Sequence, residues 1–175
     1  MVVIDEAYIE FCPQQSLVSE MANFENLVIV RTMSKAFALA GVHVGYLLAN
    51  ETLMSIMRKV SAPYPLADPC AQIALLALTE ANVELMVQQV AEINQIRDTF
   101  CEALAEMLAV TSVLPSESHF VLVSFKNIEP AWHSLTEAAV VARRIPHPQL
   151  LEAIRFTIGT AEEMSLVTQV LKRLS

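Results

Sequence analysis

Three short runs in the first part of the sequence are apolar throughout: residues 2–4, 27–30 and 44–49. A strand with one face in water alternates apolar and polar residues, whereas a strand covered on both faces does not. The runs therefore predict neighbouring strands of a parallel sheet in an α/β layer. Such strands need further strands and covering helices. A run that opens at residue 2 therefore indicates the second half of a longer protein.

Apolar residues recur at helical spacing through the middle of the sequence. Residues 51–60 predict a short helix that ends before Pro63 and Pro65. Residues 68–108 predict two helices with a break at 79–82.

The remaining sequence alternates between the two kinds of element. We expect strands at 110–114, 120–125, 140–143 and 154–158, and helices at 130–138 and 162–174. Thr160 and Glu163 predict a capping box for the last helix. The predicted fold class is α/β. Its expected parts are a partial parallel sheet in residues 1–66, connecting helices in 67–108 and a small C-terminal α/β domain in 109–175.

Composition excludes several classes of partner. The formal charge of −8 argues against nucleic acid, because such binding depends on basic side chains that neutralise phosphates. The longest uncharged stretch, residues 36–50, is shorter than the about 18 to 20 apolar residues that cross a bilayer, so we expect no membrane partner. No secretory leader is recognisable, and Cys12, Cys70 and Cys101 are odd in number and lack metal-ligand spacing. We expect a cytoplasmic protein without a metal site.

One lysine stands in a largely apolar segment, RTMSKAFALAGVHVGY at residues 31–46, and DEAY precedes it at residues 5–8. These motifs resemble the cofactor-holding segments of fold-type I pyridoxal-phosphate enzymes, most closely the histidinol-phosphate aminotransferase family. The cofactor needs an amine for a Schiff base, a carboxylate beside its ring nitrogen and donors for its phosphate. The groups present are the Lys35 amine, the Asp5 carboxylate and the hydroxyls of Thr32 and Ser34. Two neighbouring parallel strands could bring Asp5 and Lys35 to one pocket.

The resemblance implies roles for four further residues. Tyr8 would hydrogen-bond the phenolic oxygen of the cofactor, and Tyr64 matches a segment at the active-site mouth. Arg155, in IRFTIGT, would grip the phosphate of the substrate and later the carboxylate of the keto acid; a structural salt bridge is its alternative. His43 stands where the family usually has an arginine that clamps the cofactor phosphate. An imidazole cannot reproduce that fork, so His43 is either a weaker phosphate contact or a residue tolerated in a relaxed pocket.

Three more arginines have open roles. Arg31 could compensate for His43 or form a structural ion pair. Arg143 and Arg144 follow an apolar stretch and could approach the substrate pocket or form a solvated rim. The sequence alone leaves these alternatives undecided.

The resemblance implies a pyridoxal-phosphate aminotransferase of histidine biosynthesis. It would transfer an amino group between histidinol phosphate, or a similar amino compound, and a 2-oxo acid. It would act as a homodimer or with a missing N-terminal half, because the resemblance covers the whole chain but only the C-terminal half of the family's length. Residues 1–66 would then be the remnant of the cofactor-binding large domain. Whether this chain is itself an enzyme stays open. The alternatives are an inactive remnant that keeps a dimerisation surface and a related decarboxylase of a phosphorylated amino acid.

Overall fold

The computed structural model describes residues 1–174. The chain divides into two compact units, Met1–Val90 and Ala91–Ser175. We call these unit 1 and unit 2 and describe each by itself. The long helix α3 (Glu80–Ala105) begins in unit 1 and ends in unit 2. The finer division of the chain at residues 66 and 108 stays a prediction.

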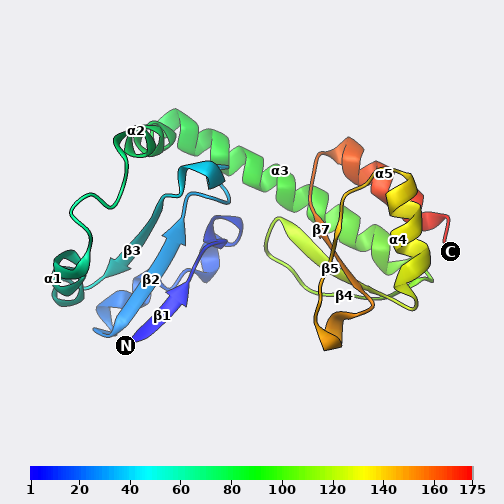
Figure 1. Cartoon of the computed structure of the whole chain (residues 1–175), viewed down its shortest axis with the longest axis horizontal. Helices are drawn as coiled ribbons and strands as arrows, with labels where there is room; N and C mark the ends of the chain where they lie inside the picture. Colours follow the sequence, from blue (N-terminus) through cyan, green and yellow to red (C-terminus); the bar gives the residue numbers. More distant parts are fainter. Residues whose placement is uncertain (175) are drawn as a thin grey trace. The chain divides into compact units, whose positions relative to one another are not determined.

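Unit 1 contains a three-stranded sheet in the order β1-β2-β3, formed by β1 (Val2–Asp5), β2 (Leu27–Thr32) and β3 (Gly45–Ala49) (Figure 1). The strands β1 and β2 are parallel, as predicted, but β3 is antiparallel to β2. The expectation that all three runs are parallel was therefore wrong for the third. The connection at residues 33–44 holds only a short 3-10 turn, Ala40–Val42, and lacks the crossover helix by which a chain usually returns to the start of a parallel neighbour.

The core of unit 1 lies around β2. Leu27, Val28 and Ile29 are buried there, as expected for a strand covered on both faces. In β1, however, Val2 and Val3 are 48% and 53% exposed. The prediction of covering on both faces therefore holds for the start of β2 and fails for β1.

Three helices follow the sheet of unit 1. The limits of α1 (Glu51–Val60) agree with the prediction, whereas α3 begins inside the predicted break at 79–82 and ends at Ala105 rather than at 108. Helix α1 begins at Asn50, whose side chain accepts a hydrogen bond from the Leu53 N–H. Helix α2 (Asp68–Ala77) ends before Thr79, where the predicted break lies, and α3 then begins at Glu80. Among the described residues no single helix is long and apolar enough to span a bilayer. The pair α2 and α3, bent by 71°, passes that test together by length and composition only.

Unit 2 is built on an antiparallel sheet in the order β4-β5-β7-β6. Its strands are β4 (Val110–Val113), β5 (Phe120–Phe125), β6 (Arg143–Arg144) and β7 (Ala153–Thr157). Helices α4 (Ile128–Glu137) and α5 (Ala161–Lys172) complete it together with the second part of α3. The predicted strands at 110–114, 120–125 and 154–158 and both predicted helices are present, but the strand predicted at 140–143 is only the two-residue β6, Arg143–Arg144.

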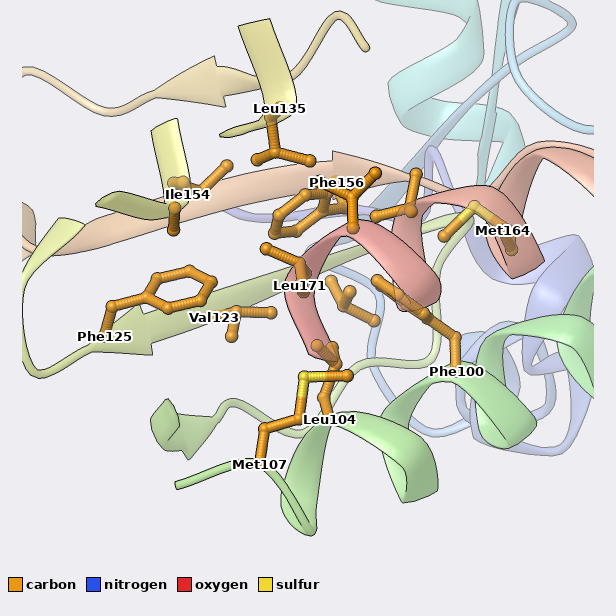
Figure 2. Packing of buried hydrophobic residues seen from close by; sticks show 14 of the residues in the cluster. Phe100, Leu104, Met107, Val123, Phe125, Leu135, Ile154, Phe156, Met164 and Leu171 are labelled. Carbon is orange, nitrogen blue, oxygen red and sulfur yellow. The ribbon is translucent and has the colours of Figure 1, made fainter. Parts of the chain in front are cut away.

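One hydrophobic core holds unit 2 together. In β5 buried residues alternate with partly exposed ones, so one face of the sheet packs against the helices. Figure 2 shows Leu104 from α3, Phe156 from β7 and Leu171 from α5 pointing into the same interior. The predicted capping box is confirmed: Thr160 and Glu163 exchange hydrogen bonds at the start of α5.

Candidate cofactor site

Lys35 lies in a loop that leaves the end of β2. Met33, only 2% exposed, anchors the loop, and its carbonyl accepts a hydrogen bond from the Leu39 N–H. Thr32 and Ser34 are joined by a 2.9 Å hydrogen bond between their hydroxyls, and the Ser34 N–H donates to Thr32 Oγ1 at 3.1 Å. These contacts hold two hydroxyls beside a half-buried lysine.

The Lys35 loop also borders a small apolar cavity of about 230 Å³ within unit 1. Phe37 and Leu39 line it from the loop, and Ile73 and Leu76 line it from α2. The loop therefore lies beside α2 as well as at the end of β2.

Asp5 is the last residue of β1, and Tyr8 follows it in the chain. Asp5 is aligned with Val30, and because β1 and β2 are parallel, both strands end at the same edge of the sheet. Asp5 Oδ1 accepts a hydrogen bond from the Ala7 N–H at 2.9 Å, which fixes the turn that leads to Tyr8. The Lys35 Nζ atom lies 5.4 Å from the centroid of the Tyr8 ring, within the range of a cation–π interaction.

A buried ion pair fastens the ends of β1 and β2 to each other. Glu6 Oε2 accepts hydrogen bonds from Arg31 Nε at 3.0 Å and Nη2 at 2.8 Å. Ser16 and the Leu17 N–H also donate to the Glu6 carboxylate. Burial by itself raises the pKa of Glu6, but the hydrogen bonds from Leu17, Arg31 and Ser16 outweigh it, so the pKa lies below its ordinary value. The sequence left two roles open for Arg31, and in the structure Arg31 forms the ion pair, with Glu6.

His43 closes the far end of the Lys35 loop in a left-handed backbone conformation, with φ 55° and ψ 38°. Histidine is among the non-glycine residues that adopt this conformation more often than most. The residue is exposed, and no hydrogen bond or ion pair of its imidazole occurs within residues 1–174. No hydrogen bond or ion pair among the described residues therefore holds the His43 imidazole in one orientation.

Arg155 lies in unit 2, in β7, on the sheet face opposite the core. Its guanidinium carbon is 5.2 Å from the centroid of the Phe120 ring. Its Nε is buried and has no hydrogen-bond partner among the described residues, and no salt bridge of Arg155 occurs there. The alternative of a structural salt bridge is thus absent, and Arg155 presents a partly buried cation without an acid partner.

The structure separates the roles of the two arginines that precede Arg155. Arg144 Nη2 pairs with Glu129 Oε2 at 2.9 Å, and its guanidinium lies 4.8 Å from the centroid of the Trp132 ring. Arg143 is aligned opposite Arg155 in the register of β6 and β7, so both side chains project from the same sheet face. The sequence does not reveal this register. It shows that Arg143, and not Arg144, lies opposite Arg155.

Two other predictions concern the surroundings of the site. Tyr64 lies in the turn between α1 and α2, and 93% of it is exposed. No group of three or more His, Cys, Asp or Glu residues with the geometry of a metal site occurs among the described residues.

The sequence matches the family of aminotransferases of class I and II over residues 1–173, and the chain belongs to that family. Its relatives include histidinol-phosphate aminotransferases. That of Pasteurella multocida (histidinol-phosphate aminotransferase 1) is 42% identical over 176 residues, which cover 100% of this chain and 50% of that protein. The chain therefore spans about half the length of the curated relatives it matches.

Solved structures show the same fold. The histidinol-phosphate aminotransferase from Clostridium acetobutylicum is 27% identical, with a TM-score of 0.84 over 99% of this chain and 54% of that one. The enzyme from Sinorhizobium meliloti, solved in complex with pyridoxal-5'-phosphate, has a TM-score of 0.78 over 100% of this chain and 50% of that one. It is 23% identical, so this likeness shows the fold alone. The fold is that of the fold-type I pyridoxal-phosphate aminotransferases.

The residues at the ends of β1 and β2 fit the cofactor that this family uses. An amine (Lys35), a carboxylate (Asp5) and two hydroxyls (Thr32 and Ser34) come from one edge of one sheet. These are the groups that pyridoxal phosphate requires from a protein. The exception is His43, which offers the phosphate no planar fork of donors.

Proposed function

We propose that this chain carries the lysine-bearing part of an aminotransferase site that acts on histidinol phosphate or a similar amino compound and on a 2-oxo acid. One observation carries the proposal: Lys35 lies beside Tyr8 at the edge where the parallel strands β1 and β2 both end. The family membership and the histidinol-phosphate aminotransferase relatives support it.

Each residue has a separate role in this proposal. When bound, pyridoxal phosphate supplies an aldehyde and an electron-withdrawing ring. Lys35 Nζ would hold the cofactor through its aldehyde, and as a free amine it would be the base that accepts the proton from the substrate Cα. Asp5 stabilises positive charge at the ring nitrogen. The Tyr8 hydroxyl donates to the phenolic oxygen.

In this proposal each unit has anion-binding residues of its own. The hydroxyls of Thr32 and Ser34 donate to the cofactor phosphate, and His43 adds a weaker contact there. Arg155 binds the anionic group of the substrate, because a guanidinium without an acid partner pairs with phosphate or carboxylate through two parallel hydrogen bonds. Tyr64 contributes at the mouth of the site.

Borohydride trapping tests the role of Lys35. The chain contains four lysines, at positions 35, 59, 126 and 172. After incubation with pyridoxal phosphate and reduction, peptide mass mapping should place the stable adduct on Lys35. A Lys35→Ala variant should lose the adduct and its visible absorbance, whereas Lys59→Ala, a change on the exposed side of α1, should retain both. An adduct spread evenly over the four lysines would refute the assignment.

A second candidate is a non-catalytic remnant that keeps a dimerisation surface. One observation favours it: His43 stands in place of the arginine that usually clamps the cofactor phosphate. A measurement of aminotransferase activity distinguishes the catalytic chain from the non-catalytic one. Transfer of an amino group to a 2-oxo acid by this chain, abolished in Lys35→Ala, would exclude the non-catalytic chain. Release of CO₂ without any need for the 2-oxo acid would instead indicate a decarboxylase.

A further inference from the structure

An aromatic ring, and not an acid, is the neighbour of the Arg155 guanidinium. The guanidinium carbon lies 5.2 Å from the centroid of the Phe120 ring, within the range of a cation–π interaction. No hydrogen bond or salt bridge of the guanidinium occurs within residues 1–174. The ring attracts the cation without neutralising it, so the charge of Arg155 stays available to an anion.

The register of β5 and β7 produces this contact. Leu122 lies opposite Arg155, and Phe120 lies opposite Thr157. Since alternate residues of a strand share a face, Phe120 is the diagonal neighbour of Arg155 on the sheet face away from the core. An aromatic side chain is long enough to reach across such a diagonal. The contact therefore follows from the pairing of two strands and not from the conformation of a loop.

Phe120 is itself held in place at the start of β5. Its backbone carbonyl accepts hydrogen bonds from the hydroxyls of Ser116 and Ser118. The buried Arg97 of α3 donates a hydrogen bond to the Ser118 carbonyl at 3.3 Å. The His119 ring packs edge-on against the Phe120 ring, with centroids 5.9 Å apart and planes at 85°. The Phe120 ring is therefore a restrained platform.

A second pair of an arginine and an aromatic ring in unit 2 differs in one respect. The Arg144 guanidinium lies 4.8 Å from the centroid of the Trp132 ring, but its Nη2 also pairs with Glu129 Oε2 at 2.9 Å. The carboxylate already neutralises the charge of Arg144. Arg155 instead combines an aromatic contact with the absence of an acid partner, and an arginine that binds an anion needs both a defined orientation and an available charge.

We propose that Phe120 is a positioning residue for Arg155. The face of its ring holds the guanidinium plane in an orientation in which two parallel N–H groups can bind a phosphate or a carboxylate. A long side chain that is already oriented loses less conformational entropy when the anion binds. The inference rests on the proposed function in one respect, that Arg155 binds the anionic group of the substrate, and it is independent of Lys35.

Phosphate affinity tests the positioning role in the full chain. Calorimetry with inorganic phosphate should give an affinity about two- to fivefold lower for Phe120→Leu, which keeps an apolar side chain but removes the ring face. Phe120→Tyr keeps the ring face and should retain the parent affinity. Trp132→Leu, which removes the ring beside Arg144, is the matched control, and its phosphate affinity should equal that of the parent chain.

A spectroscopic signature separates positioning from a general loss of structure. The ring current of Phe120 should displace the NMR signals of the Arg155 δ-methylene and Nε–H groups from their ordinary positions. The displacement should vanish in Phe120→Leu and persist in Phe120→Tyr and Trp132→Leu. Thermal unfolding of each variant shows that the fold is retained.

The outcomes distinguish this inference from the proposed function. Unchanged phosphate affinity in Arg155→Lys would contradict the anion-binding role of Arg155 and this inference with it. A lower affinity in Arg155→Lys together with an unchanged affinity in Phe120→Leu would overturn the positioning role alone. Equal losses in Phe120→Leu and Trp132→Leu would also overturn it, because the effect would then not depend on the ring beside Arg155.

Discussion

The Lys35 Nζ atom lies 5.4 Å from the centroid of the Tyr8 ring, although Tyr8 follows β1 and Lys35 follows β2. The contact exists because β1 and β2 are parallel and end at the same edge. It places an amine and a phenol where both could meet one cofactor. The predictions below test this arrangement and the structure that supports it.

Removing the hydroxyl of Tyr8 should weaken cofactor binding but not abolish attachment to Lys35. In Tyr8→Phe the ring and its contact with the ammonium group remain, and one proposed hydrogen bond is lost. We expect the affinity for pyridoxal phosphate to fall by about tenfold, as titration of the visible absorbance would measure. Tyr46→Phe, which removes a different hydroxyl, the one that hydrogen-bonds with Arg31, is the comparison. Equal effects of the two changes would contradict the role of Tyr8.

An arginine at position 43 should strengthen the phosphate contact. A guanidinium offers a planar pair of donors, which imidazole lacks, so His43→Arg should tighten cofactor binding by about tenfold. His133→Arg, an exposed change in α4, controls for added positive charge. If both variants gain affinity equally, the gain comes from net charge and not from position 43.

Loss of Arg155 should affect anion binding and leave the fold intact. The side chain has no acid partner to lose, so Arg155→Lys should unfold at nearly the same temperature as the parent chain. The affinity for inorganic phosphate, measured by calorimetry, should fall by about tenfold or more because an ammonium group cannot form the bidentate pair. Arg144→Lys should leave phosphate affinity unchanged, because Arg144 already pairs with Glu129. A large drop in unfolding temperature for Arg155→Lys would show a structural role instead.

The Glu6–Arg31 pair should make unit 1 sensitive to acid. The pKa of Glu6 is lower in the folded chain than in the unfolded chain. The ionised Glu6 carboxylate therefore stabilises the fold fully at a pH above the ordinary carboxyl pKa. This stabilisation is lost as the pH falls through the pKa of Glu6 in the folded chain. Glu6→Gln should therefore flatten the decline in the free energy of unfolding at acidic pH. Urea unfolding at a series of pH values would measure it.

Removing the arginine of that pair should be more costly than removing an exposed one. Arg31→Ala leaves a buried carboxylate without its cation, and we expect a loss of about 3 kcal/mol in the free energy of unfolding. Arg58 forms an exposed pair with Glu51, and Arg58→Ala should cost less than about 1 kcal/mol. Similar costs would mean that the Glu6–Arg31 pair does not hold the two strand ends.

The core of unit 2 supports a comparison of two leucines near the end of α3. Leu104 is fully buried, and Leu104→Ala should lower the free energy of unfolding by about 2 to 5 kcal/mol through the lost contacts and the cavity. Leu108 is 72% exposed, so Leu108→Ala should have little effect. Chemical denaturation followed by circular dichroism would measure both.

Local patterns in the sequence predicted most helices and strands of this fold. Apolar spacing predicted α1, a break between α2 and α3, and the strands β4, β5 and β7, because each depends on neighbours a few residues away. The capping box of Thr160 and Glu163 followed from the same short range. The motifs around Asp5 and Lys35 were equally local, and they identified the family.

Tertiary structure decided what local patterns leave open. The apolar run of β3 does not encode its direction, which depends on how the connection at residues 33–44 returns to the sheet. The pairing of Arg31 with Glu6, and of Arg144 with Glu129, joins residues far apart in the sequence. The register of β6 and β7 placed Arg143 beside Arg155. The sequence thus determined which chemical groups this chain carries, and only the tertiary structure decided which charges neutralise one another, because ion pairing depends on distance in space and not along the chain.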